Sequence, residues 1–363
     1  MNAILTALAP YFFSVIFPLI IFLLLKRPAM VVANRIGLVD NPNERKLHIG
    51  AIPLVGGILI FLSVFITNFL ISNIGEEWAF FQNYFFAGGL ILLMGLLDDR
   101  FDVRAVIKLL FQLSLALFAF YNGIRVESLN GILGFYEISF VAQLLITVLG
   151  ITGFINAFNL MDGVDGLASG FAFLTLSLFL ILNLILGNYT EILLLISLCT
   201  ALIVFFKFNV GPKISKIFLG DAGSLFLGFT IVLAAISLLN SGTVLESNLY
   251  FALVIVALSI PMIDSIRVYI FRINKGRSPF RADRSHFHHL MVEAGVKPVK
   301  ASAIIIGYSF LMISISIILI NYLSINAFLI ALIVSFTVFV MLLNFNLKIS
   351  MWKVRIREME NKT

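Results

Sequence analysis

Three aspartates, Asp98, Asp99 and Asp102, lie within one five-residue segment of the sequence. Carboxylates this close repel one another unless a cation or a substrate compensates their charge. Oxygen ligands that leave room for water suit Mg²⁺, and the ion can then bridge to phosphate oxygens. Lys108 follows about 9 Å from Asp102 along an expected helix, at 1.5 Å per residue. The group indicates phosphate chemistry with Mg²⁺; a solvated turn with a snorkelling lysine is the alternative.

A second polar group ends a long apolar run. Asn156, Asn159 and Asp162 are three residues apart, so they share one face wherever the helix continues. Two Asp-Gly pairs, beginning at Asp162 and Asp165, then interrupt the helix and let backbone and carboxylates approach a ligand. Such pairs also occur as plain turns. We favour a ligand site, because residues 159–166 contain two aspartates and no lysine or arginine.

The motif Gly220-Asp221-Ala222-Gly223-Ser224 begins another apolar run. A glycine-rich helix start presents free N–H groups to phosphate, and Asp221 is a candidate metal ligand beside them. Glycine and serine are also ordinary packing residues between membrane helices. The motif alone therefore does not decide between the two roles.

Three of the four histidines, His286, His288 and His289, lie close together and follow Arg284. A zinc site would prefer histidines four residues apart or cysteine partners, and the cluster offers neither. Histidine beside arginine instead fits hydrogen bonding to phosphate, sugar or base. The alternative is that these residues form a solvated loop on the membrane surface with no ligand. Lys46 and His48 form a lesser basic pair nearer the amino terminus.

An unusually apolar chain must position these clusters. Of its 363 residues, 61% are hydrophobic and 12% are charged, whereas a soluble domain carries about a quarter charged residues. Apolar runs of about twenty residues can cross a hydrocarbon core roughly 30 Å thick. We therefore exclude a single soluble globule and expect an all-α, polytopic membrane protein with one domain, residues 1–363. The eleven expected spans are 4–25, 53–73, 78–97, 105–122, 138–158, 167–186, 191–206, 217–239, 248–267, 301–320 and 325–345.

Positive charge predicts the orientation of these spans. With the amino terminus outside, every Lys and Arg except Arg125 falls on an inner segment, as do all Asp and His residues or the helix ends that carry them. We therefore expect a cytoplasmic carboxyl terminus and chemistry at the cytoplasmic face of the plasma (inner) membrane. The net charge of +6 is a topology signal on this interpretation and indicates no nucleic-acid partner. The inner segments are 26–52, 98–108, 159–166, 207–221, 267–300 and the basic tail 346–363.

Together the motifs resemble those of the polyprenyl-phosphate N-acetylhexosamine-1-phosphate transferase superfamily, of the glycosyltransferase family 4 type. The resemblance covers residues 40–290 in order. The pattern of histidines in this sequence is similar to that of the bacterial branch acting on UDP-N-acetylglucosamine and undecaprenyl phosphate. The muramoyl-pentapeptide branch typically carries three consecutive histidines, which Phe287 interrupts here. The motifs are Arg45-Lys46-x-His48 with Pro53 and Gly56-Gly57, Asp98-Asp99-x-x-Asp102, Asn156-x-x-Asn159-x-x-Asp162-Gly-x-Asp165-Gly, Gly220-Asp221-x-Gly-Ser, and Asp283-Arg284-x-His286-x-His288-His289.

The resemblance implies a reaction and a role for each cluster. Undecaprenyl phosphate would attack the β-phosphate of UDP-N-acetylglucosamine, giving lipid-diphosphate-N-acetylglucosamine and UMP. Asp98 would receive the lipid phosphate as base or orienter, and Lys108 would meet the pyrophosphate. Asp102 is Asn in some relatives, so we expect its charge to be dispensable. The implied sites are catalytic Asp98, Asp99 and Lys108; Mg²⁺ (or Mn²⁺) ligands Asp221, Asn159 and Asp162; nucleotide-sugar ligands Asn156, Asp165, Arg284, His286, His288 and His289; and phosphate or lipid ligands Lys46, His48 and Asp102.

Other functions stay open at this point, beginning with the muramoyl-pentapeptide branch of the same superfamily. An intramembrane prenyltransferase also binds Mg²⁺ through Asp motifs, but it has no use for the histidines or for Gly220-Asp221-Ala222-Gly223-Ser224. A secondary transporter would place charges near the bilayer midplane on broken helices, whereas only Lys108 is embedded here. The glycan pathway, an N-acetylgalactosamine donor and a homodimer are further open questions.

Overall fold

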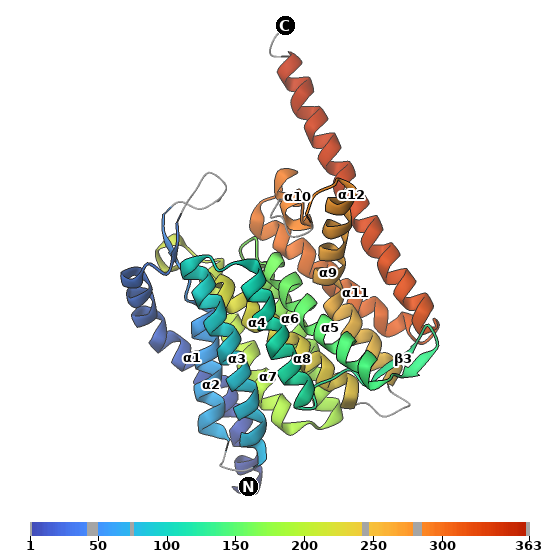
Figure 1. Ribbon diagram of the computed structural model, residues 1–363. Helices are drawn as coiled ribbons and strands as arrows, with labels where there is room; N and C mark the ends of the chain where they lie inside the picture. The colour runs from blue at the N-terminus through green and yellow to red at the C-terminus, as the bar shows by residue number, and fades with distance from the viewer. Residues whose placement is uncertain (1, 42–49, 73–75, 242–246, 279–284, 361–363) are drawn as a thin grey trace.

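The computed structural model describes residues 2–41, 50–72, 76–241, 247–278 and 285–360, and it shows an almost entirely helical protein (Figure 1). In this part of the chain, nine helices are long and apolar enough to cross a membrane, and two shorter apolar helices accompany them. The eleven are α1 (Asn2–Ile36), α2 (Gly56–Ile71), α3 (Glu76–Phe101), α4 (Ala105–Tyr121), α5 (Phe140–Met161), α6 (Leu167–Leu186), α7 (Tyr189–Asn209), α8 (Gly220–Ser241), α9 (Ser247–Asn274), α11 (Pro298–Leu319) and α12 (Ile325–Glu360).

Each expected span coincides with one of these helices, which confirms the all-α membrane architecture. The number of crossings stays a prediction, because α2 and α4 have only 16 and 17 residues. A helix needs about 20 residues to cross a bilayer unaided.

Several segments that we expected to be loops are helical. Helix α1 continues to Ile36 and ends before Gly37, whose φ of 72° is the left-handed conformation that stops a helix. Helix α12 continues to Glu360 through a tail rich in lysine, arginine, glutamate and methionine, which are good helix formers. The smaller elements are α10 (Phe287–Glu293), the 3₁₀ helix η1 (Lys213–Ser215), and two hairpins, β1 (Val39–Asp40) with β2 (Ile52–Pro53) and β3 (Ser128–Ile132) with β4 (Phe135–Glu137).

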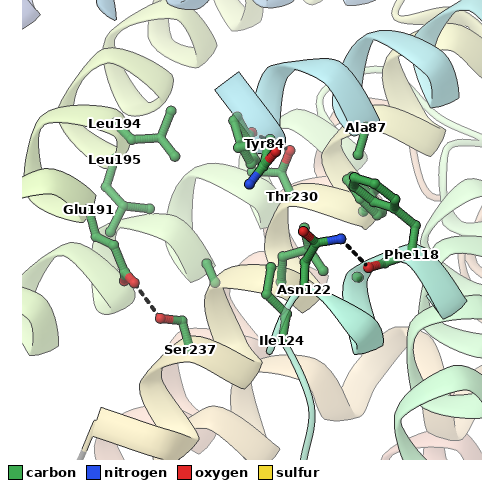
Figure 2. Close-up of a pocket in the computed structure, with 15 residues that line it drawn as sticks. Tyr84, Ala87, Phe118, Asn122, Ile124, Glu191, Leu194, Leu195, Thr230 and Ser237 are labelled. Carbon is green, nitrogen blue, oxygen red and sulfur yellow. Dashed lines mark hydrogen bonds between the residues drawn. The ribbon is translucent and has the colours of Figure 1, made fainter. Parts of the chain in front are cut away.

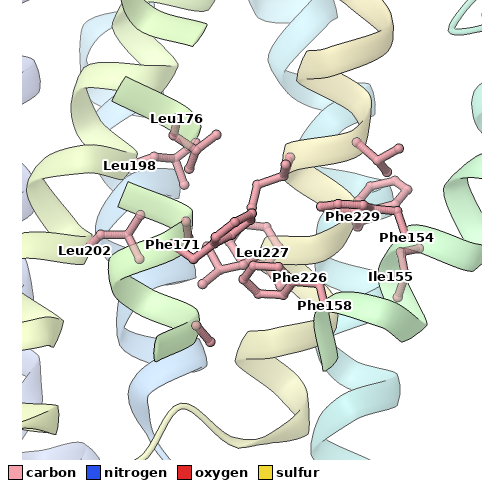
Figure 3. Packing of buried hydrophobic residues seen from close by; sticks show 14 of the residues in the cluster. Phe154, Ile155, Phe158, Phe171, Leu176, Leu198, Leu202, Phe226, Leu227 and Phe229 are labelled. Atoms are coloured by element: carbon pink, nitrogen blue, oxygen red, sulfur yellow. The ribbon is translucent and has the colours of Figure 1, made fainter. Parts of the chain in front are cut away.

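Helix α8 is the centre of the bundle. Of the residues in its apolar span, 83% are buried, against 17% for α1, which lies at the periphery. It contacts α2, α3, α5, α6 and α9. Figure 3 shows Phe226 and Phe229 of α8 packed among aromatic rings of α5 and α6, including Phe158 and Phe171. Burial of large aromatic side chains on all sides fixes the position of this helix.

Glycines bring two neighbouring helices against the first turn of α8. A Cβ atom at Gly95 of α3 would lie 2.3 Å from the Cα of Ala222, and one at Gly57 of α2 would lie 2.3 Å from the amide nitrogen of Gly223. Any side chain at either position would collide with backbone, so only glycine permits this approach. The residues that begin α8 are therefore held by backbone contacts on two sides.

The polar elements gather at one end of the bundle. Helix α10, the β1–β2 hairpin and the end of α12 lie at the top of Figure 1, whereas hairpin β3–β4 and the start of α1 lie at the bottom. The beginning of α8 also belongs to this end, because the backbone amide of Phe218 donates to Pro53 of the β1–β2 hairpin. Hydrogen bonds from α8 and α5 then join the ends of α3 and α5 to the same place, and short turns connect these ends to α4 and α6. This grouping agrees with the charge pattern, while the sidedness of the membrane stays an expectation.

Candidate active site

An ion pair joins the end of α3 to the start of α4. The Nζ atom of Lys108 lies 2.6 Å from Oδ2 of Asp98, and the backbone amide of Val103 donates to Oδ1 of the same carboxylate at 3.0 Å. The side chain of Asp98 is 3% exposed and that of Lys108 is 27% exposed. A buried carboxylate with a partly accessible ammonium group beside it can present both a proton acceptor and a cation to a phosphate.

Asp99 lies next to this pair but faces α8. Its Oδ1 and Oδ2 atoms accept hydrogen bonds from the backbone amides of Asp221, at 2.8 Å, and Ala222, at 3.1 Å. Gly220 has a φ of 74°, and a Cβ there would lie 2.6 Å from Asp99 Oδ2. Asp99 thus satisfies free amides in the first turn of α8, a task that a capping residue usually performs from within its own chain segment.

Asp221 is held from α5. The side-chain amide of Asn159 donates to Oδ1 of Asp221 and to Oγ of Ser224, both at 2.7 Å. Asp98 and Lys108 also interact electrostatically with Asp221. The structure therefore brings three of the four sequence clusters together, through Asp98, Asp221 and Asn159.

Asp162 follows directly after α5 and lies near the same group. Burial, with the carboxylates of Asp221 and Asp165 adding to it, raises the pKa of Asp162 to about 7. A bound cation would relieve this cost. Among the described residues, no three or more His, Cys, Asp or Glu side chains converge as a complete metal site. Mg²⁺ needs only one or two protein carboxylates when waters and substrate phosphates supply its other ligands, so these oxygen donors fit it.

Two expected ligands of the nucleotide sugar have partners within the protein. Asp165 Oδ2 lies 2.5 Å from Nζ of Lys216, which follows η1. Asn156 donates to Oε1 of Gln112 on α4 at 2.5 Å, and this pair is separate from the Asn159–Asp221 contact. Lys216 and Gln112 were not expected from the sequence, because neither belongs to a motif.

The histidines lie at the start of α10, against the loop between α5 and α6. His288 is fully buried, and its Nε2 would lie 2.2 Å from a Cβ at Gly163, so the ring rests on that glycine. The ring of His289 is 4.2 Å from that of His288, centroid to centroid. Burial, with His289 and His286 adding to it, lowers the pKa of His288 well below its usual value. This ring is therefore neutral at pH 7, and it joins the fourth cluster to the Asp162–Asp165 loop.

His286 contacts a residue that sequence analysis left without a role. Its Nδ1 atom lies 2.9 Å from Oδ2 of Asp264, which also pairs with Arg267. We expected Lys108 alone to be embedded in a span, but Asp264 also lies within the expected span 248–267. That position was the signal available for this site, since intramembrane ionisable residues are usually functional.

Four further residues were expected at the site: Asp102, Lys46, His48 and Arg284. Asp102 is exposed, with a φ of 50°, at the turn between α3 and α4. Lys46, His48 and Arg284 lie outside the described residues.

A separate cavity of about 150 Å³ lies at the other end of the same helices (Figure 2). It is lined by the opposite ends of α3, α4, α7 and α8, including Tyr84, Phe118 and Phe229. Tyr84 hydrogen-bonds to Thr230 at 2.7 Å, and Ser237 donates to Glu191. This mostly apolar cavity lacks the grouped carboxylates and the lysine, so we place the chemistry at the carboxylate end.

Comparison with known proteins gives the same assignment along most of the chain. Residues 81–239 match the family described as Glycosyl transferase family 4. An undecaprenyl-phosphate alpha-N-acetylglucosaminyl 1-phosphate transferase of Yersinia pestis is 36% identical over 76% of this chain and 75% of its own length. The protein with that name in Escherichia coli (strain K12) is 32% identical, over 80% and 78%. A probable undecaprenyl-phosphate N-acetylglucosaminyl 1-phosphate transferase of Bacillus subtilis is 33% identical, over 73% and 72%.

Proposed function

The chain belongs to glycosyl transferase family 4, and we infer that it is a phosphoglycosyltransferase acting on undecaprenyl phosphate. It transfers N-acetylglucosamine 1-phosphate from UDP-N-acetylglucosamine, giving undecaprenyl-diphosphate-N-acetylglucosamine and UMP. The observation that carries this function is the grouping of the Asp98–Lys108 pair with Asp221, Asn159 and Asp162 at one end of the bundle. Transfer between two phosphates needs such a mixture of cation and oxygen ligands.

The Asp98–Lys108 pair accounts for the acceptor half of the reaction. An oxygen of the lipid phosphate forms a bond to the β-phosphorus of the donor, and the bond from that phosphorus to the oxygen of UMP breaks. If the lipid phosphate arrives with a proton, Asp98 takes it. Little base strength is needed, because the second pKa of a phosphate monoester is about 6. Lys108 compensates the charge of the entering phosphate or of the pyrophosphate.

Mg²⁺, or Mn²⁺ in its place, fits the donor half. Asp221 and Asp162 would hold it, with the side-chain carbonyl of Asn159, whose amide nitrogen already orients Asp221. When bound, the ion neutralises phosphate charge and stabilises the departure of UMP. Asp99 keeps the turn that carries Asp221 in position through its two hydrogen bonds to backbone amides.

The nucleotide sugar then lies against the Asp162–Asp165 loop and the histidines that pack on it. Asp165, Asn156, His286, His288, His289 and Arg284 are the proposed ligands of the donor, and Lys46, His48 and Asp102 those of the phosphate or lipid. The reaction takes place at the cytoplasmic face of the inner membrane, with the amino terminus outside. The concentration of Lys and Arg on the inner segments supports this orientation.

The decisive experiment is turnover of radiolabelled UDP-sugars by the purified protein with undecaprenyl phosphate and Mg²⁺. UDP-N-acetylglucosamine should give UMP and a lipid diphosphate sugar in equal amounts. Release of UDP in place of UMP would show transfer of the sugar without its phosphate and would overturn the proposal. UDP-N-acetylgalactosamine and UDP-muramoyl-pentapeptide, run in parallel, define the donor.

A further inference from the structure

Asp264 of α9 makes two contacts with the segment that begins the histidine cluster, and Arg267 makes a third. Its Oδ2 atom lies 2.9 Å from Nδ1 of His286 and 3.4 Å from the backbone amide of Phe287. Its Oδ1 atom accepts hydrogen bonds from Arg267, one turn further along α9, at 2.5 and 3.0 Å. Arg267 in turn donates to the backbone carbonyl of Ser285 at 2.7 Å. Two adjacent side chains of α9 thus hold three consecutive residues, Ser285, His286 and Phe287.

The contact between Asp264 and His286 is shielded from water. Asp264 is 3% exposed and His286 is 4% exposed. The ring of Phe287, on the other side of the segment, packs edge-on against Phe336 and Phe339 of α12. The segment is therefore fixed by polar contacts to α9 on one side and by aromatic packing on α12 on the other.

The pairing also determines which nitrogen of His286 is available. An ionised carboxylate has no hydrogen to give, so Nδ1 must carry the hydrogen of the Asp264–His286 bond. With its hydrogen on Nδ1, the imidazole form of the ring presents a lone pair at Nε2. That atom is buried, and it has no hydrogen-bond partner among the residues that the structure describes. Because a buried polar atom is costly without a partner, Nε2 is set up to accept a hydrogen bond from a ligand.

The position of His286 indicates which ligand this is. Its ring is nearly parallel to that of His288, with 6.0 Å between centroids and 13° between planes. His288 rests on Gly163, between Asp162 and Asp165. The free nitrogen therefore belongs to the wall of the site that we assign to the nucleotide sugar. A phosphate oxygen cannot donate to a lone pair, whereas a sugar hydroxyl or an amide N–H can.

We propose that Asp264 is a positioning residue for the donor substrate: with Arg267 it orients His286 so that Nε2 accepts a hydrogen bond from a hydroxyl or amide N–H of the nucleotide sugar. This inference rests on the proposed function and adds a recognition role to it. Asp264 acts through His286, and it does not touch the substrate itself.

The test is a double-substitution cycle in purified protein, read as the KM for each substrate separately. Asp264→Asn allows the side-chain amide to donate to Nδ1, which stabilises the wrong tautomer. We expect about a tenfold rise in the KM for UDP-N-acetylglucosamine, as for loss of one charge-assisted hydrogen bond, and an unchanged KM for undecaprenyl phosphate. In a His286→Ala background the same substitution should change the donor KM by less than about twofold, because the two residues act as one unit.

The inhibition constant of UDP, measured in the same variants, locates the contact within the donor. A rise that UDP shares assigns the contact to the nucleotide, and a rise confined to UDP-N-acetylglucosamine assigns it to the sugar. Equal rises in both KM values for Asp264→Asn, or full additivity with His286→Ala, would overturn the proposal and leave Asp264 a structural role only.

Two further measurements keep the result interpretable. If Asp264→Asn lowers the unfolding temperature so far that kinetics cannot be measured, Asp264→Glu retains the charge beside Arg267 and changes only the reach to His286. The same split between the two KM values is expected of it, and its absence would overturn the proposal. Wild-type turnover is the separate check on function, since a failure to release UMP there would refute the transferase itself.

Discussion

Lys108 and Asp98 lie ten residues apart on two different helices, and their charged atoms are 2.6 Å from each other. The contact closes the turn between α3 and α4 and places an acid and a cation beside the first turn of α8. Because the carboxylate is almost fully buried, its charge depends on Lys108 for compensation.

Loss of Lys108 should therefore cost stability as well as activity. Lys108→Met leaves a buried carboxylate unpaired, which typically costs about 3 kcal/mol or more. We expect a lower unfolding temperature in detergent than for Asp98→Asn, whose remaining lysine can reach solvent. The double variant Asp98→Asn/Lys108→Met should recover most of the lost stability while staying inactive. An unfolding temperature unchanged by Lys108→Met would show that the pair is hydrated.

Asp99 should matter more for stability than its neighbour Asp102. Asp99→Asn loses one of two acceptors for the amides that begin α8, at a cost of about 1 kcal/mol. Asp102→Asn removes the same charge from an exposed residue, and asparagine tolerates its left-handed backbone, so we expect no change in unfolding temperature. Thermal unfolding of the two variants checks the difference. A loss of activity by Asp99→Asn at unchanged stability would instead assign Asp99 a direct part in the chemistry.

Asp221 should be indispensable for turnover. Asp221→Ala removes the carboxylate that Asn159 orients, and among the described residues no other carboxylate receives that hydrogen bond. We expect loss of UMP release with the protein still folded, since the neighbouring backbone is held by Gly57 and Gly95. Near-normal activity at saturating Mg²⁺ would remove Asp221 from the metal site.

Metal binding should depend on pH through Asp162. Burial raises the pKa of Asp162 from 3.8 to about 7, so the carboxyl group is increasingly protonated below neutrality. The half-saturating Mg²⁺ concentration should therefore rise as pH falls below about 7, by up to tenfold per unit, and level off above it. Asp162→Asn should flatten this profile, and a wild-type profile that is already flat would contradict the assignment.

The same shift in the pKa of Asp162 predicts how the stability of the metal-free protein depends on pH. A carboxyl group with a raised pKa favours folding while it is protonated, so this contribution is present below about pH 4 and is lost as pH rises through about 7. Mg²⁺ should offset the loss at neutral pH. Thermal unfolding with EDTA and with Mg²⁺, across this pH range, measures both effects.

A methyl group at Gly163 should disturb donor binding selectively. A Cβ there would lie 2.2 Å from Nε2 of the buried His288, so Gly163→Ala must displace the ring. We expect a severalfold rise in the KM for UDP-N-acetylglucosamine with little change for undecaprenyl phosphate. Gly150→Ala on α5 is the control, because a Cβ there would meet no atom within 4 Å. Equal kinetics for the two variants would separate His288 from the donor site.

Much of this architecture could be predicted because the bilayer imposes it. Long apolar runs were enough to predict the helices, and motif order was enough to predict the family. Spacing along α5 also indicated Asn159 as a partner in the site. The spacing did not show that Asn156 and Asn159 have different partners. Because α5 lies between two other helices, Asn156 faces Gln112 on α4, whereas Asn159, one turn further along, faces Asp221 on α8.

Contacts between distant segments escaped prediction. The hydrogen bonds from Asp221 and Ala222 to Asp99 depend on the close approach of α3 to α8. Gly95 permits this approach, but a glycine in the sequence does not show which helix will lie against it. The Asp264–His286 pair depends on how α10 folds back over the end of α9. In both cases the decisive quantity is a helix–helix distance, and no local pattern encodes it.

Helix α12 is longer than a membrane is thick. Its 36 residues extend about 54 Å at 1.5 Å per residue, against a hydrocarbon core of roughly 30 Å. Its last turns stand clear of every other helix in Figure 1. The protein thus carries a built-in rigid spacer, and a fluorescent label or affinity handle attached at Glu360 would begin well away from the other helices of the bundle.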